Sequence, residues 1–312
     1  MIDTPGDPDY VRLVIRRAKS MKGKSSVLLG GVAIFVISIL LSHSGFGEEG
    51  APDISLEASQ FALLESIPDE HPVFVMTLLQ FDREEGIASC RDFVDLTVPH
   101  LRQLGGELIF YGEAQRFDIE DQGAHEIFGF RPNPWDALLV TRFPSRRDVR
   151  AFCEKEEYQA AVDSLQASVK DAVVYALNGT GYKNIRRSSA ETFGPPDFPA
   201  EDTLYMLNLL HFKHEGGHED YVENYGKKAM PLIRKRGGDI LFGLHPEQLL
   251  IGEEEYERVI LVRYPSSDVF AEMMLSDEYQ AVAHFREEAI DIGHLYGFSN
   301  AFEELKLGEW KE

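Results

Sequence analysis

Phe-Val-Met-Thr-Leu-Leu-Gln-Phe at residues 74–81 and Tyr-Met-Leu-Asn-Leu-Leu-His-Phe at residues 205–212 are two versions of one apolar stretch, 131 positions apart. Both stretches are rich in residues that favour strands. Further along the chain, Pro99 and Gly105-Gly106 match Pro231 and Gly237-Gly238 at an offset of 132. Self-similarity at a fixed spacing predicts that the body of the chain consists of two copies of one structural unit.

A third match extends each copy. Arg142-Phe143-Pro144-Ser145 and Glu157-Tyr158-Gln159-Ala160 recur as Arg263-Tyr264-Pro265-Ser266 and Glu278-Tyr279-Gln280-Ala281, now at an offset of 121. The fall in offset places an insertion in the first copy, in the Gly-, Pro- and charge-rich stretch 116–134, which we interpret as a long loop.

Within each copy the signals predict the order strand, helix, strand, strand, helix, strand. The Gly-Gly pair is typical of a helix C-terminus, and the serine of each Pro-Ser pair is suited to cap the second helix. This βαββαβ order is the ferredoxin-like split βαβ unit. The expected elements are first helices at 88–104 and 219–236, apolar strands at 137–143 and 258–264, and last strands at 172–178 and 292–299.

A sheet with both helices on one face must have its other face covered. Two copies in one chain can cover each other, so we expect an α+β fold in which repeats 1 and 2 pair within the chain. The expected organisation is a cytoplasmic basic head (1–24), a transmembrane anchor (25–47), a spacer (48–72), repeat 1 (73–180), a Pro-rich linker (181–202), repeat 2 (203–302) and a tail (303–312).

These motifs resemble those of a known family. Asn-Leu-Leu-x-Phe, a helix ending in Gly-Gly, Arg-Tyr-Pro-Ser, Glu-Tyr-Gln-Ala and a later Arg are similar to the small bacterial proteins of domain of unknown function 1330, in the dimeric α+β barrel superfamily. The second copy is the closer one, because the first has Thr77, Phe143 and Leu165 where the second has Asn208, Tyr264 and Arg286. The resemblance implies two ferredoxin-like units fused as an intrachain dimeric α+β barrel. It implies no particular chemistry.

The net charge of −22 excludes nucleic acid as a partner of the whole chain, since such partners require a basic surface. Residues 1–47 carry +3 and the remainder −25. Residues 25–47 contain no Asp, Glu, Lys or Arg, and basic residues precede them. This pattern predicts a single-pass anchor with a cytoplasmic N-terminus and a periplasmic or extracellular body. A cleaved signal peptide, which would leave a secreted protein, is the alternative.

Several polar residues are candidates for holding a ligand. Met206, Asn208, Leu210 and Phe212 share one strand face and Leu207, Leu209 and His211 the other. Arg263 ends an apolar strand, where it could hold an anion or carbonyl in a cavity between sheet and helix or between the two sheets, or could pair with a surface acid. The candidate ligand-binding residues are Asn208, His211, Arg263, Tyr264, Tyr279, Arg286 and Arg142.

The sequence predicts neither a metal site nor a cofactor. His214-Glu215-Gly216-Gly217-His218 matches the zinc motif H-E-x-x-H, but the adjacent glycines interrupt the helix that the motif requires. His284 is the histidine that could serve as a haem ligand, and an exposed helical histidine explains it equally well. Cys90 and Cys153 have no ligand-like spacing, and we expect buried, unpaired thiols.

Three functions remain open at this point. The first is a membrane-anchored module that binds a small organic molecule in or beside the barrel. The second, implied by the superfamily resemblance, is a cofactor-free monooxygenase- or isomerase-like enzyme with its site in repeat 2. The third is a structural or partner-docking domain, suggested by the acidic surface of the body.

Overall fold

A computed structural model of the chain describes residues 52–68, 71–83, 85–115, 133–179 and 202–302. The expected anchor (25–47), most of the Pro-rich linker and the long loop of the first copy lie outside these residues. None of the helices within the described ranges has both the length and the apolar character needed to span a membrane.

The same order of elements occurs twice along the described chain. The first half comprises α3 (Ala58–Glu65), β1 (Val73–Phe81), α4 (Gly86–Gln103), β2 (Glu107–Ala114), β3 (Ala137–Phe143), α6 (Arg146–Cys153), α7 (Glu156–Gln166) and β4 (Val169–Asn178). The second half comprises β5 (Leu204–Phe212), α8 (Gly217–Asp220), η4 (Tyr221–Gly226), α9 (Lys227–Lys235), β6 (Asp239–Ile251), β7 (Arg258–Tyr264), α10 (Ser267–Leu275), α11 (Asp277–Ala289) and β8 (Ile290–Asn300).

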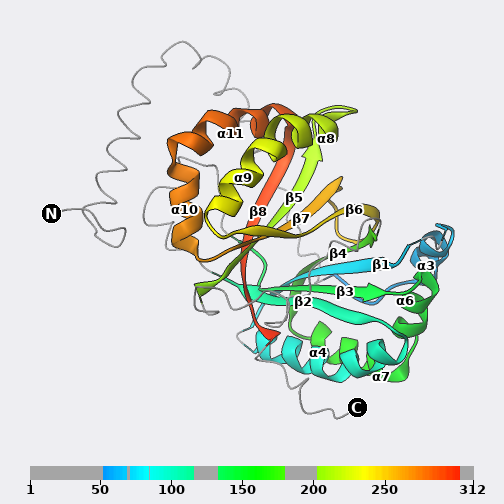
Figure 1. Ribbon diagram of the computed structural model, residues 1–312. Coiled ribbons are helices and arrows are strands. Elements are labelled where there is room, and N and C mark those ends of the chain that lie inside the picture. Colours follow the sequence, from blue (N-terminus) through cyan, green and yellow to red (C-terminus); the bar gives the residue numbers. More distant parts are fainter. Residues whose placement is uncertain (1–51, 69–70, 84, 116–132, 180–201, 303–312) are drawn as a thin grey trace, which may run out of the picture. The chain divides into compact units, whose positions relative to one another are not determined.

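The eight strands form one closed antiparallel barrel in the order β1-β3-β2-β8-β5-β7-β6-β4. Each half contributes four adjacent strands, and the halves join where β2 pairs with β8 and β4 pairs with β6. Helices α4, α6 and α7 cover the strands of the first half, and α9, α10 and α11 cover those of the second (Figure 1). The α+β barrel that the sequence predicted is confirmed.

The interior of the barrel is filled with side chains. Alternate residues of the strands meet there, among them Phe74, Leu207, Leu261 and Phe298, all fully buried. The sequence predicted a ligand cavity either between the two sheets or between sheet and helices. The first of these predictions is wrong for the described barrel, because close-packed apolar side chains occupy that space. The space between sheet and helices remains.

The predicted helix signals are confirmed in detail. Ser145 and Ser266 each accept a hydrogen bond from the backbone N–H three residues later, at 3.2 Å in both cases. Each expected second helix is two helices, and Ser276 caps the later one in the second half by accepting from Tyr279 N at 3.3 Å. These caps satisfy backbone N–H groups at the start of each helix.

The first helix of the second half contains one residue more than its counterpart. Gly86 and Gly217 open the two helices, and Gly105 and Gly237 end them with φ of 72° and 80°. The second helix therefore absorbs an additional residue, and it does so as the π-helical turn η4, whose i to i+5 bonds give a wider turn. The extra residue accounts for the change in sequence offset from 131 to 132.

The segment predicted as a spacer before the first strand differs from that expectation. Residues 58–65 form α3, with Phe61 and Leu64 buried against the first half. Ile54 packs under the helices of that half, and its backbone N–H donates to Gln166 Oε1 at 2.8 Å. Phe61 and Leu64 lie on the same face of this short helix, and their burial attaches α3 to the barrel.

A buried ion pair links the two halves where the barrel closes. The guanidinium of Arg146 on α6 and the carboxylate of Glu247 on β6 meet through two N–O contacts, of which Nε to Oε2 is 3.1 Å. The two side chains are 2% and 7% exposed. Asn178 Nδ2 donates to the same carboxylate at 2.8 Å.

Removing one charge of this pair should destabilise the whole barrel. We expect Glu247→Gln to lower the free energy of unfolding by about 3–5 kcal/mol, because it removes the charge of one partner in a buried, hydrogen-bonded ion pair. The measurement is urea denaturation followed by circular dichroism. Glu154→Gln, which breaks the exposed pair with Arg150 (2.7 Å), is the matched control and should cost about 0.5 kcal/mol or less. Equal effects of the two substitutions would contradict this account.

Candidate ligand-binding site

A cavity of about 340 Å³ lies between the sheet and the helices of the second half. Its floor is the helix-facing side of β5 and β7, and its roof is η4, α9, α10 and α11. Most of its wall is apolar, and the polar members of the wall are Asn208, His218, Tyr221, Tyr225, Lys227, Arg258, Tyr264, Tyr279 and Arg286. Four of the seven candidate residues, Asn208, Tyr264, Tyr279 and Arg286, thus meet in one cavity.

Arg286 on α11 is a half-buried cation without a carboxylate partner among the described residues. Among the described residues, no carboxylate oxygen lies within 4.0 Å of its guanidinium, and its Nη2 is buried with no hydrogen-bond partner. A side chain at Gly293 would place Cβ only 3.3 Å from Nη2, so this glycine leaves room for the group. A guanidinium that keeps one buried nitrogen without a partner is suited to an anionic ligand.

Arg258, at the start of β7, is a second cation in the same cavity. It makes no ion pair or hydrogen bond within the part of the chain that the structure describes, and its Nη2 lies over Gly243, 2.8 Å from where a Cβ would stand. In the sheet, Leu210 pairs with both Gly293 and Arg258. Strand spacing then puts the backbones of Gly293 and Arg258 about 10 Å apart, so both guanidinium groups lie at one end of the cavity.

The sequence analysis missed Arg258, although a signal for it was present. Arg258 has the same strand phase as Ile260, Val262 and Tyr264, and this phase faces the helices. A charged residue in line with the buried face of a strand needs a partner or a polar cavity. The candidate predicted from the sequence in this strand is Arg263, at its other end.

Tyrosines surround the two arginines. Tyr225 and Tyr279 are within hydrogen-bond distance through their hydroxyl groups, at 3.0 Å. Burial raises the pKa of Tyr221 to about 12, although Arg286 opposes the rise. Burial also raises the pKa of Tyr225 well above its ordinary value. Tyr221 and Tyr225 are therefore neutral at physiological pH, and the arginines give the cavity its positive charge.

Two histidines lie beside Arg258. The rings of His218 on α8 and His245 on β6 meet edge to face, with centroids 4.9 Å apart. Burial lowers the pKa of His218, and the positive charge of Arg258 lowers it further. Burial, Arg258 and His218 likewise lower the pKa of His245. Both imidazoles are neutral at pH 7, and Nε2 of His218 is buried without a hydrogen-bond partner among the described residues.

The other three candidate residues lie elsewhere. Arg142 pairs with Glu107, Nη2 to Oε1 at 3.3 Å. Arg263 has the strand phase of Val259 and Leu261, which face the barrel interior, and it lies opposite Tyr205. Nδ1 of His211 is 3.5 Å from Glu257 Oε2. None of the three lines the cavity in the second half.

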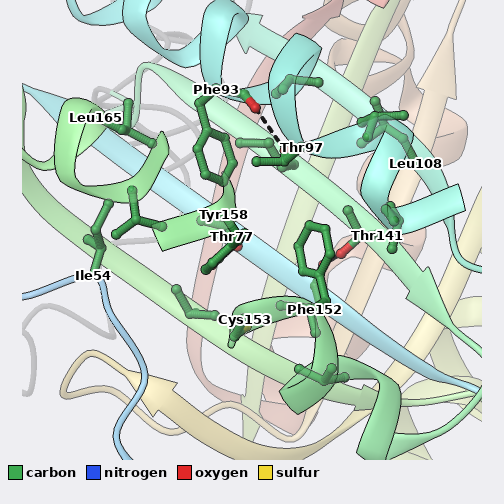
Figure 2. Close-up of a pocket in the computed structure, with 18 of the residues that line it drawn as sticks. Ile54, Thr77, Phe93, Thr97, Leu108, Thr141, Phe152, Cys153, Tyr158 and Leu165 are labelled. Carbon is green, nitrogen blue, oxygen red and sulfur yellow. Dashed lines mark hydrogen bonds between the residues drawn. The ribbon is translucent and has the colours of Figure 1, made fainter. Parts of the chain in front are cut away.

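The first half has a cavity at the corresponding place, but it is small and apolar. Its volume is about 80 Å³. Thr77, Tyr158 and Leu165 lie around it together with Phe152, and Ile54 lies at its side (Figure 2). Phe143 completes the wall. The positions of Asn208, Tyr264 and Arg286 are thus occupied by Thr77, Phe143 and Leu165, and the anion-binding character is absent.

A second exchange separates the two cavities. In the first half, Tyr111 pairs with Leu139 and β3 begins with Ala137, whereas in the second half Gly243 pairs with Ile260 and β7 begins with Arg258. The buried Tyr111 side chain, whose hydroxyl donates to Glu113 at 2.8 Å, fills the space beside the small Ala137. In the second half the small residue is Gly243, at the position of Tyr111, and the large residue is the charged Arg258, at the position of Ala137.

Metal ligands do not gather in the described ranges: no group of three or more His, Cys, Asp or Glu there is placed to hold an ion. His214 precedes Gly216, which has a φ of 85°, and is outside the helix that carries His218, so the H-E-x-x-H histidines are not on one helix face. Cys90 and Cys153 are buried and unpaired, as the sequence predicted.

The residues that form the cavity lie almost entirely within a segment that matches one protein family. Residues 208–295 match the family described as Domain of unknown function (DUF1330). The DUF1330 match covers less than a third of the chain, but it contains every residue of the cavity wall except Met206. No curated protein matches the chain.

Solved structures resemble the chain at low identity. An anthrone oxidase-like protein is 11% identical with a TM-score of 0.47, covering 75% of this chain and 93% of that protein. A protein of unknown function from Rhodopseudomonas palustris is 27% identical with a TM-score of 0.30, covering 32% and 82%. A chlorite dismutase from Candidatus Nitrospira defluvii is 11% identical with a TM-score of 0.42, covering 79% and 97%.

The influence of Arg258 on His218 can be measured directly. Because the folded-state pKa of His218 is below about 6.5, the unfolded chain binds this proton first, and the His218 contribution to stability is lost as pH falls below about 6.5. We expect Arg258→Met to raise the pKa of His218 toward its ordinary value, measured by NMR titration of the imidazole. Arg142→Met, remote from the cavity, is the control. An unchanged His218 pKa in Arg258→Met would contradict the proposed coupling.

Proposed function

We propose that the second half of the barrel binds a small organic anion with an apolar body. The observation that carries this proposal is the presence of Arg258 and Arg286 in one cavity without carboxylate partners among the described residues. The chain has 53 acidic residues against 31 basic ones. Two half-buried guanidinium groups that have no carboxylate partner among the described residues of so acidic a protein are best explained by an anion that comes from outside.

The rest of the wall defines the class of ligand. Met206, Met230, Met273 and Met274 with Phe270 and Ile233 supply flexible and apolar contacts. A volume of about 340 Å³ is at the lower end of the range for small-molecule sites. The ligand we propose therefore combines one carboxylate or similar oxyanion with a compact aromatic or aliphatic body.

A pair of ligands that differ only in charge tests this proposal. We expect 3-phenylpropionate to bind the purified body of the protein, and its neutral analogue 3-phenylpropanamide to bind at least about tenfold more weakly, because charge-assisted hydrogen bonds to arginine are lost. Arg286→Leu, which introduces the residue of the first half, should weaken the carboxylate by about tenfold or more and leave the amide unchanged. Isothermal titration calorimetry measures all three.

The matched control is Arg142→Leu, which removes the same charge from the surface of the other half. It should leave both affinities unchanged. Equal binding of carboxylate and amide to the wild-type protein, or equal loss in Arg142→Leu and Arg286→Leu, would contradict a specific anion site.

We also propose that residues 25–47 anchor the protein in the cell membrane, with the barrel on the outer side. The apolar run without charged residues and the basic residues before it support this arrangement. The two βαββαβ halves, arranged in tandem, then form one binding module at the membrane surface.

Fractionation of cells that express the full chain tests the anchor. We expect the protein in the membrane fraction, resistant to extraction with carbonate, and a chain starting at residue 48 in the soluble fraction. The barrel should be digested by protease added outside intact cells or spheroplasts. Release of the full chain as a shorter soluble protein would instead indicate a cleaved signal peptide.

A further inference from the structure

His218 lines the cavity that we propose for the anion, and the binding proposal leaves it without a role. It lies on α8 at the same end of the cavity as Arg258. Its Nε2 is buried and has no hydrogen-bond partner among the described residues. A buried imidazole nitrogen without a hydrogen-bond partner lowers the stability of the fold, and a catalytic role is one explanation for its presence.

The groups around His218 determine its protonation state. Arg258 and His245 approach it from the sheet, and Glu257 acts on it over a longer range. On its own helix, Glu219 Oε1 is 4.0 Å from Nδ1. This carboxylate favours the tautomer with the proton on Nδ1, which leaves Nε2 as a proton acceptor.

We infer that the second half catalyses proton abstraction from the carbon next to a ketone in a 2-oxo acid, with His218 as the base. This inference rests on the proposed anion site. The substrate carboxylate binds Arg286, its apolar group contacts the methionine wall, and its ketone oxygen faces Arg258.

The step is balanced without any further reactant. His218 Nε2 takes the proton, the C–H electron pair becomes the carbon–carbon double bond, and the carbonyl π pair moves onto oxygen. The resulting enolate oxygen carries a negative charge beside the Arg258 guanidinium, which stabilises it. When the imidazolium proton is replaced by a deuteron from D₂O before delivery to carbon, the result is exchange, and delivery of a proton to oxygen gives the enol.

Neutral His218 and charged Arg258 are a matched acid–base pair for this chemistry. Burial and the nearby Arg258 charge lower the pKa of His218, which weakens the imidazole as a base but favours its unprotonated, reactive form at neutral pH. The same guanidinium lowers the energy of the enolate. One residue therefore adjusts both partners of the proton transfer.

Phenylpyruvate is the probe for this reaction, because it combines a carboxylate, a ketone, an acidic CH₂ group and a phenyl ring. We expect the wild-type body of the protein to bind it in calorimetry and to accelerate the replacement of its C3 hydrogens by deuterium in D₂O, followed by proton NMR. His218→Gln should lower the catalysed exchange by about a hundredfold or more, with a dissociation constant within about threefold of the wild type.

The controls separate a chemical role from a structural one. His284→Gln, on the exposed side of α11, should leave exchange unchanged. Added imidazole should restore part of the exchange in His218→Ala. The catalysed rate of the wild type should rise with pH, with a midpoint below the ordinary imidazole pKa of about 6.5, and then level off. This dependence should be absent in His218→Gln.

The outcomes distinguish this inference from the proposed function. Binding of phenylpyruvate without accelerated exchange would overturn the inference and leave the anion site standing. Exchange that persists in His218→Gln would overturn the role of His218. Failure of the wild-type protein to bind either phenylpyruvate or 3-phenylpropionate would overturn the anion site and the inference together.

Discussion

The structure depends on the burial of two apolar sheet faces, the inner faces of the first and second halves. Each half is a four-stranded sheet whose helices cover one face, and its other face is as apolar as the first. Joining the halves through the β2–β8 and β4–β6 pairs buries both inner faces and leaves the described barrel without an unpaired edge. Because the interior must be filled for this closure to be stable, space for a ligand remains only under the helices.

Much of the fold could be predicted from the sequence because its signals are local. The apolar strands at 137–143 and 258–264 have the predicted bounds, and both Pro-Ser pairs begin helices as expected. The site was harder, because the alternation of a strand tells which residues share a face but not which face holds a cavity. Asn208, Tyr264, Tyr279 and Arg286 were predicted from the motifs that resemble the family, whereas Arg258 belongs to none of these motifs.

The two halves differ in the side chains that lie between sheet and helices. Replacement of Leu165 by Arg286, of Ala137 by Arg258 and of Tyr111 by Gly243 changes an apolar core position into a cationic one while the backbone keeps its course. The π-turn η4 has a complementary effect. It widens the helix above the sheet by one residue, and Tyr221, Val222, Tyr225 and Gly226 of this turn all belong to the cavity wall. Only the second half has both changes.

Fusion of the two halves in one chain has a consequence for stoichiometry. In a barrel made of two identical subunits, a substitution that creates a cavity creates it in both halves, and both halves lose the corresponding packing energy. Here the first half retains a packed apolar layer, and the segment around Ile54 and α3 adds to it. The proposed anion site is then present once in each barrel, and neither half has to compromise between rigidity and recognition.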